Sequence, residues 1–324
     1  MIKTPLCDLL GIDYPIILAP MGSATSAEFA AAASNAGGLG SIGTLTRATA
    51  DVLRDIKAIT SLTTRPYAIN HIVPTLDETS FIATLEARPA VISFALGDPG
   101  ELVHQAQDAG ALVIIQVTTV AQAIEAAERG ADLIIAQGGE AGGYGGVVST
   151  LVLVPQVVDA VAPVPVVAAG GIFDGRGLAA ALLLGAVGVN IGTRFLASTE
   201  APITDGWRRA ILNANSEDTM KVDALNDIQP LPGTAGYGTV LRSIRTPFMD
   251  KWQAKREEAR SARELLQQEM QTAIKAGRRH EILLTAGQTA GGIKDVLPVA
   301  QLMRRMMAEA EIALARAAES YPSA

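Results

Sequence analysis

The sequence has a single cysteine, few charged residues and no long basic or apolar run. Cys7 stands alone among 324 residues, so no internal disulfide can form and a metal site built on thiolates is excluded, which favours a reducing compartment. The net charge of -7, without a basic stretch, makes nucleic acid and an anionic membrane surface poor partners. No run of about 20 uninterrupted apolar residues occurs, and Asp8 and Asp13 interrupt any leader-like segment. These absences predict a cytoplasmic protein with a small-molecule ligand.

Two common nucleotide-binding motifs are also missing. No GxGxxG opens a helix after the first strand-like run, and no Walker sequence occurs, so a dinucleotide-binding domain and a P-loop have little support. His104 and His280 lack neighbouring metal-ligand partners in the sequence, and we expect no metal site.

What the sequence does contain is a regular alternation of short apolar runs with Ala-rich amphipathic stretches. This alternation is typical of βα units around a buried parallel sheet. Eight runs read as strands: Ile16 to Met21, Gly38 to Gly43, Pro66 to His71, Ala90 to Leu96, Ala111 to Val117, Ala131 to Gln137, Val164 to Gly170 and Val187 to Gly192. Eight strands with their crossovers predict a closed TIM (β/α)8 barrel, and a doubly wound sheet is the alternative.

The helices between these runs, and a change of composition near Ala201, suggest the domain organisation. The predicted barrel helices include Ser26 to Asn35, Ala50 to Thr60, Asp98 to Ala109, Val120 to Arg129 and Gly175 to Leu184. Two long polar helices are predicted over Met249 to Ala276 and Ile293 to Ala318. We therefore expect a barrel over residues 1-200, a mainly helical insert covering its mouth over 201-292, and a C-terminal helix packed on the barrel over 293-324.

The most informative segment is the glycine-rich run from Gln137 to Gly146, which directly follows the sixth apolar run. Its glycines let the backbone approach a flat ligand closely and present amides without obstruction. A mobile surface loop has the same composition. The position of the run at a strand end, where barrels place their ligands, favours binding.

The ends of the other runs belong to the same mouth and carry groups suited to a flavin. Amides at Asn70, Gln116 and Gln137 can each donate and accept a hydrogen bond, as the polar edge of a flavin or pyrimidine ring requires. The loops after the seventh and eighth runs, Gly170-Gly171 and Gly192-Thr193-Arg194, stand where this fold holds phosphate. A pair of tight turns is the plain alternative.

Several motifs together resemble the nitronate monooxygenase family, formerly called 2-nitropropane dioxygenase, which is similar to flavin-dependent enoyl-ACP reductases and NADH:quinone reductases. The resemblance rests on Pro20-Met21-Gly22, Asn35 to Gly40, the glycine-rich run, Ala168 to Ile172, Gly192 to Phe195 and Ala286-Gly287-Gln288. It implies a barrel that holds FMN without a covalent bond. The residues implied to bind FMN are Pro20, Met21 and Gly22 beside the ring, Asn70, Gln116, Gln137, Gly138, Gly142 and Gly143 around it, Gly170, Gly171, Gly192 and Thr193 at the phosphate, and Gln288.

The chain departs from the family at Tyr144, where most members have a histidine that acts as a base. An ordinary phenol, with a pKa near 10, is a poor base at neutral pH but a competent hydrogen-bond donor and acid. Oxidation of an alkyl nitronate by dioxygen, to a carbonyl compound and nitrite, needs no base and survives the substitution. Tyr144 then orients the anion.

Reduction of a quinone or enoyl thioester with NAD(P)H uses the same phenol as an acid and is the alternative. A binder of phosphate ligands without activity is a third reading. A homodimer is compatible with the sequence, which does not fix the oligomeric state.

Three further polar residues carry less specific hypotheses. His71 follows Asn70 directly, and strand alternation turns it to the opposite face, so we expect a structural role for it. Glu140 is either a second acid or base, or a partner of amides or of Arg194. Tyr237 could line the entrance, although Gly-Tyr-Gly is also a common turn.

Overall fold

The fold is taken from a computed structural model that describes residues 2-45, 47-231 and 239-320. Tyr237 lies outside these residues. All the predicted apolar runs contain parallel strands: β1 (Ile16–Leu18), β2 (Gly40–Gly43), β3 (Tyr67–Ile72), β4 (Val91–Ala95), β5 (Leu112–Val117), β6 (Leu133–Gln137), β8 (Val166–Ala169) and β9 (Gly188–Ile191). The sheet runs in the order β1-β9-β8-β6-β5-β4-β3-β2. A parallel bridge from Ile17 to Leu39 joins the two ends, which confirms the TIM barrel.

The strands alternate between an inner and an outer apolar face, as a buried parallel sheet requires. Inward residues such as Ile17, Val91 and Val167 fill the lower barrel together with Leu6 and Leu10. These two leucines come from α1 (Pro5–Leu10), which closes the bottom of the barrel. The carboxyl ends of the strands remain as the open rim.

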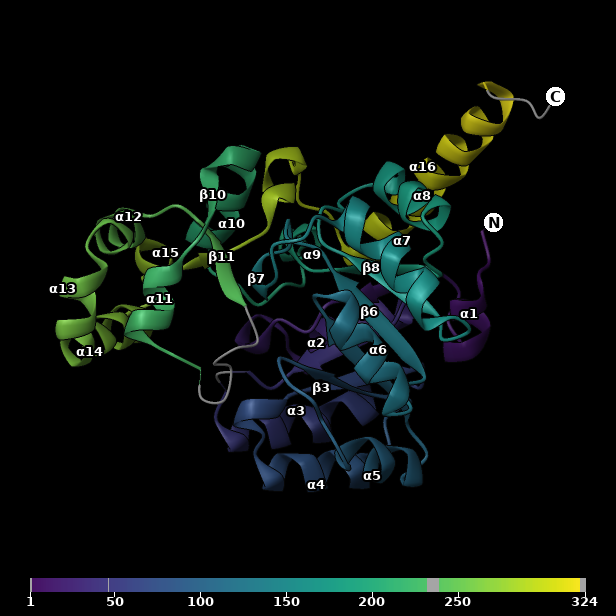
Figure 1. Ribbon diagram of the computed structural model, residues 1–324, viewed down its shortest axis with the longest axis horizontal. Coiled ribbons are helices and arrows are strands. Elements are labelled where there is room, and N and C mark those ends of the chain that lie inside the picture. Colours follow the sequence, from purple (N-terminus) through teal and green to yellow (C-terminus); the bar gives the residue numbers. More distant parts are fainter. Residues whose placement is uncertain (1, 46, 232–238, 321–324) are drawn as a thin grey trace.

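Helices cover the outside of the barrel (Figure 1). They are α2 (Ala27–Asn35), α3 (Thr49–Leu62), α4 (Glu78–Ala87), α5 (Leu102–Asp108), α6 (Val120–Glu128), α7 (Thr150–Val161), α8 (Gly175–Leu183) and the short α9 (Thr193–Leu196). Several begin with a side-chain cap: Ser26, Asp77, Thr119 and Asp174 each accept a hydrogen bond from an N–H group of the first turn. The final helix α16 (Val299–Ser320) packs along α8, and Leu302, Met303 and Met306 join the outer core.

The segment between α9 and α16 contains a small antiparallel sheet that the sequence did not reveal. Its strands are β10 (Thr219–Lys221), β11 (Val240–Ile244), β12 (Leu284–Thr285) and β7 (Gly143–Gly145), which is part of the glycine-rich run. Tyr144 pairs with Leu241 across this sheet. The glycine-rich run is therefore a strand tied to a segment about 100 residues further along the chain, and the mobile-loop alternative is wrong for this part of it.

Helices complete this segment, and Figure 1 shows most of them beside the barrel (green). They are α10 (Asp205–Asn213), α11 (Asp223–Ile228), α12 (Pro247–Ala254), α13 (Arg256–Ser261), α14 (Arg263–Lys275) and α15 (Arg279–Ile282). The single helix predicted over Met249 to Ala276 is thus wrong: it is three helices. Lys255 and Ala262 interrupt it with non-helical backbone angles, and Arg256 and Arg260 on the middle helix both pair with Asp227.

Candidate functional site

Amide side chains form the upper inner surface of the barrel. Asn70 donates hydrogen bonds to the backbone and hydroxyl oxygens of Ser93. Gln137 and Asn190 each bury a carbonyl oxygen that has no partner in the described part of the chain, and the Gln116 amide makes no hydrogen bond there either. Buried polar atoms are nearly always hydrogen-bonded in native proteins, so the carbonyl oxygens of Gln137 and Asn190 are suited to accept hydrogen bonds from a bound ligand. Asn190 was not among the predicted site residues, although it is the inward residue nearest to the end of β9.

The glycine-rich run bends over this surface and meets two distant segments. A Cβ atom on Gly142 would stand 2.6 Å from the carbonyl carbon of Ala286, so the two backbones touch. The Gln288 N–H donates to the Glu140 carbonyl (3.0 Å), and the Gly287 N–H donates to Thr193 Oγ1 (2.9 Å). The structure therefore brings the glycine-rich run, the start of α9 and the late Ala-Gly-Gln motif together.

The loops after β8 and β9 have the open backbone expected of a phosphate-binding rim. Gly170 and Gly171 follow β8 with φ angles of +93° and +75°, a region that favours glycine. Gly138 lies beneath them, because its carbonyl oxygen would stand 2.9 Å from a Cβ atom on Gly170. Thr193 is free to donate its hydroxyl hydrogen, since it accepts its bond from Gly287.

Arg194 and Glu140 are engaged elsewhere. Arg194 is buried and pairs with Asp295 (2.9 Å), and burial lowers the pKa of its guanidinium. The idea that Arg194 supports a phosphate is therefore wrong, because its charge is used to hold Asp295 before α16. Glu140 accepts from the backbone N–H and hydroxyl of Thr150, not from Arg194.

The loop after β1 lies against its neighbours on both sides. Gly22 (φ +54°) approaches the end of β2 so closely that a Cβ atom would stand 2.5 Å from the Leu45 carbonyl oxygen. Met21 approaches β9, with its sulfur 3.2 Å from a Cβ position on Gly192. Pro20 and Met21 stay partly exposed at the rim between these contacts. They line the mouth beside the amides.

Tyr144 lies at the junction of the barrel and the small sheet. Its ring packs on Ile72, Ala95 and Leu96 above β3 and β4, and on the core of the insert. Burial raises the pKa of its phenol to about 12. In the described part of the chain its hydroxyl has no hydrogen-bond partner. At neutral pH the Tyr144 phenol therefore keeps its proton, which is an unused hydrogen-bond donor.

Two cations beside Tyr144 were missed because a long-range strand pairing places them. Lys221 and Arg242 are register partners on β10 and β11. The Lys221 ammonium donates to the carbonyl oxygens of Gly145 and Val240, both at 3.0 Å. Arg242 Nε donates to the Gly139 carbonyl. Burial, with Arg242 nearby, lowers the pKa of Lys221 to about 8. They add positive charge to the glycine-rich run.

The histidines do not enter the mouth amide cluster. His71 Nε2 lies 2.9 Å from the Thr84 hydroxyl, and the ring stands edge-on to Phe81. Burial lowers the pKa of His71 to about 4, so the ring is neutral at physiological pH. The alternation that predicted a structural role for His71 agrees with this packing. His104 lies exposed on α5, and His280 lies against Gly206.

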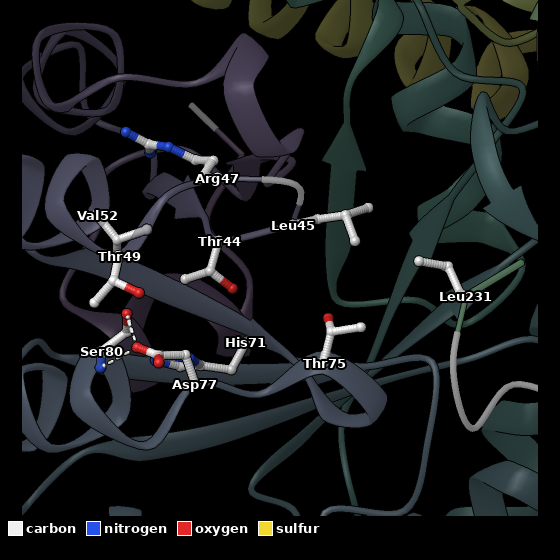
Figure 2. Close-up of a pocket in the computed structure, with 10 residues that line it drawn as sticks. All are labelled: Thr44, Leu45, Arg47, Thr49, Val52, His71, Thr75, Asp77, Ser80 and Leu231. Carbon is white, nitrogen blue, oxygen red and sulfur yellow. Dashed lines mark hydrogen bonds between the residues drawn. The ribbon is translucent and has the colours of Figure 1, made fainter. Parts of the chain in front are cut away.

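A cavity of about 230 Å³ opens beside the mouth, at the ends of β2 and β3 (Figure 2). Leu45 and Leu231 face each other across it, and both pack in the same apolar cluster as Tyr144. Most of its lining is polar or charged, namely Thr44, Arg47, Thr49, His71, Thr75, Asp77 and Ser80. Within the described residues, no helix combines the length and the apolar character that a membrane crossing needs.

A family model for nitronate monooxygenase matches residues 3–83 and 77–309, and so covers both the barrel and the small sheet. The chain belongs to the nitronate monooxygenase family. The resemblance drawn from the motifs is thereby confirmed.

Relatives within and around this family differ in their named activities. A coenzyme A ester dehydrogenase of Mycobacterium tuberculosis, (3aS,4S,5R,7aS)-5-hydroxy-7a-methyl-1-oxo-octahydro-1H-indene-4-carboxyl-CoA dehydrogenase, is 39% identical over 222 residues, which are 68% of this chain and 62% of that protein. FabK from Thermotoga maritima superposes with a TM-score of 0.90 at 33% identity, covering 99% of this chain and 100% of FabK. The nitroalkane oxidase from Streptomyces ansochromogenes gives 0.84 at 27% identity, covering 96% and 99%. The nitronate monooxygenase fold therefore extends over nearly the whole chain.

Proposed function

We propose that the protein is an FMN-dependent oxidoreductase. The observation that carries the proposal is the convergence of unpartnered amides, Gln137 and Asn190 above all, with the glycine-rich run at one barrel mouth. A flavin presents alternating donors and acceptors along its pyrimidine edge, and these amides supply the complement. Membership of the nitronate monooxygenase family supports a flavin independently.

The residues present fit FMN from ring to phosphate. We propose that Asn70, Gln116 and Gln137 bond the pyrimidine edge, while Gly138, Gly142, Gly143 and Gln288 close over the ring. Pro20, Met21 and Gly22 border it. Gly170, Gly171, Gly192 and Thr193 hold the phosphate with backbone N–H groups and one hydroxyl. When bound, FMN supplies two-electron redox chemistry. Residues 201-292 act as the cover of the mouth.

We propose an alkyl nitronate as substrate, with dioxygen as the electron acceptor and a carbonyl compound and nitrite as products. The nitronate is already an anion, so the chain does not need a base. The Tyr144 phenol stays protonated at neutral pH and donates a hydrogen bond to a nitronate oxygen. The ammonium of Lys221, on β10 and hydrogen-bonded to the Gly145 carbonyl of the glycine-rich run, favours the negative charge. Leu45 and Leu231, on the apolar side of the neighbouring cavity and in the same cluster as Tyr144, contact the carbon chain.

Anaerobic mixing of the yellow holoprotein with propyl-2-nitronate tests this substrate. The flavin absorbance near its visible maximum should bleach within seconds and return when air is admitted, with nitrite released. A protein that purifies colourless and takes up no FMN from excess would refute the cofactor. A yellow protein that the nitronate leaves oxidised would refute only the substrate.

A second candidate is electron exchange with a coenzyme A thioester or a quinone, with NAD(P)H as the partner. The 39% identity to a dehydrogenase of a coenzyme A ester favours it. In this direction the Tyr144 phenol donates its proton or hydrogen bond to the carbonyl oxygen of the substrate. Bleaching by NADH or NADPH, but not by propyl-2-nitronate, would select this candidate.

A further inference from the structure

A half-buried guanidinium, with no acidic partner in the described part of the chain, lies where the insert meets the rim of the barrel. Arg279 opens α15, and its charged group stands 5.2 Å from the ring centre of Trp207 on α10. One of its terminal nitrogens donates to the Ser23 hydroxyl (3.3 Å), just beyond Met21 and Gly22 at the end of β1. Trp207 belongs to the apolar layer that joins α10 to the loops of the barrel mouth. Arg279 therefore lies at the β1 edge of the proposed FMN site.

Three buried nitrogens in this cluster have no hydrogen-bond partner in the described part of the chain. They are Nε of Arg279, Nε1 of Trp207 and Nδ1 of His280. Trp207 is only 5% exposed. The His280 ring lies against Gly206, which precedes Trp207 in the chain. Indole and guanidinium N–H groups can only donate, so what they lack is an acceptor.

The charge of Arg279 is also uncompensated. Burial lowers the pKa of its guanidinium, and no carboxylate among residues 2-45, 47-231 and 239-320 opposes this effect. The acidic residues nearby are already engaged, because Glu281 pairs with Arg278 (2.9 Å) and Asp205 pairs with Arg208 (2.9 Å). The contact with the Trp207 face offsets only part of the cost of removing such a cation from water. A partly exposed cation with unused donors is an arrangement that can bind an anion.

We propose that Arg279, Trp207 and His280 form a phosphate subsite for the nucleotide part of a substrate, either a coenzyme A thioester or NAD(P)H. The planar fork of Arg279 matches two phosphate oxygens, and the indole N–H adds a third donor. An alkyl nitronate has no phosphate to place there. The inference rests on the second candidate function and gives it a recognition element at the β1 edge of the mouth.

Binding of nucleotide fragments to the holoprotein tests the subsite without catalysis. The chain has two tryptophans, so a Trp252→Phe background leaves Trp207 as the only indole reporter. Adenosine 3′,5′-bisphosphate represents the nucleotide end of coenzyme A, adenosine 2′,5′-bisphosphate that of NADPH, and adenosine lacks phosphate. We expect one bisphosphate to change Trp207 fluorescence and adenosine to leave it unchanged, and the tighter of the two identifies the source.

Arg279→Gln should weaken the tighter bisphosphate by about tenfold or more, because a charge-assisted hydrogen bond is lost. Arg278→Gln is the matched control, since Arg278 is exposed and paired with Glu281, and it should stay within about twofold. Arg279→Lys keeps the positive charge but lacks the planar guanidinium, and it replaces the glutamine variant if that variant does not fold. Arg279→Lys should also bind the bisphosphate more weakly than the parent.

No response to either bisphosphate, or equal binding by the Arg279 variants and the parent, would overturn the subsite. A flavin that no nitronate or nicotinamide donor reduces, in a protein that still binds a bisphosphate through Arg279, would refute the proposed function and leave the subsite intact.

Discussion

Replacement of Tyr144 by phenylalanine tests whether the Tyr144 hydroxyl acts as a hydrogen-bond donor or as a base. Burial places the pKa of the phenol at about 12, so at pH 8 about one molecule in ten thousand carries the phenolate. The ring packs on Ile72, Ala95 and Leu96, and phenylalanine keeps this packing. The change therefore removes only the free hydroxyl.

The expected loss of kcat/KM in Tyr144→Phe follows from the negative charge of the nitronate oxygen that accepts the hydrogen bond. A hydrogen bond to an anionic oxygen contributes about 1.5 to 3 kcal/mol, which corresponds to about 10- to 100-fold in kcat/KM for a nitronate. Flavin content and the unfolding midpoint should not change. Tyr67→Phe is the control, because Tyr67 is also largely buried but lies at the amino end of β3, away from the mouth.

The assay is the rate of flavin reduction by propyl-2-nitronate in anaerobic stopped flow, from pH 6.5 to pH 10. A donor with a pKa of about 12 contributes no rising limb in this range, so the ratio of parent to variant should be constant. A parent rate that climbs about tenfold per pH unit, with the slope lost in Tyr144→Phe, would refute the donor role and make the phenolate the base. Rates that match at every pH would remove Tyr144 from the mechanism.

Three further changes test the electrostatics and packing around the site. Folding lowers the pKa of Lys221 from 10.5 to about 8, so between pH 8 and pH 10.5 the unfolded chain binds a proton that the folded chain has lost. The stability of the parent should therefore rise over this range relative to that of Lys221→Met. Urea midpoints that change in parallel for the two proteins would contradict this. His71 has a pKa of about 4 in the folded chain and 6.5 in the unfolded chain, so its contribution to the free energy of unfolding is complete above pH 6.5 and is lost as pH falls to 4. His71→Phe should therefore make the free energy of unfolding less sensitive to acid by about 3 kcal/mol. An unchanged midpoint of acid unfolding would contradict this prediction. Gly142→Ala places a Cβ atom 2.6 Å from the Ala286 carbonyl carbon and should reduce the flavin content of the purified protein. Gly130→Ala is the control, because Gly130 has φ +86° in open space, and it should cost only about 1 kcal/mol of stability. Full flavin content in the Gly142 variant would show that the close backbone contact is dispensable.

Most of the barrel could be predicted because its signals are local. Each strand is a short run of branched apolar residues with a helix behind it, and parallel pairing follows from that order. The positions of Asn70, Gln116 and Gln137 follow from the same regularity, since alternation fixes which residues point inward. The long helix over Met249 to Ala276 was wrong because propensity cannot detect a break set by packing, here the two arginines that reach Asp227.

The sequence by itself determined the barrel, the rim of glycines and amides, and the family, because each is written in residues close together in the chain. Only the tertiary structure decided the electrostatics of the mouth. The pairing of Tyr144 with Leu241 brings Lys221 and Arg242 to the glycine-rich run, and the packing of α15 on α10 buries Arg279 beside Trp207. Charges that meet across more than 70 residues leave no local pattern, and burial, which shifts their pKa values, exists only in the folded chain.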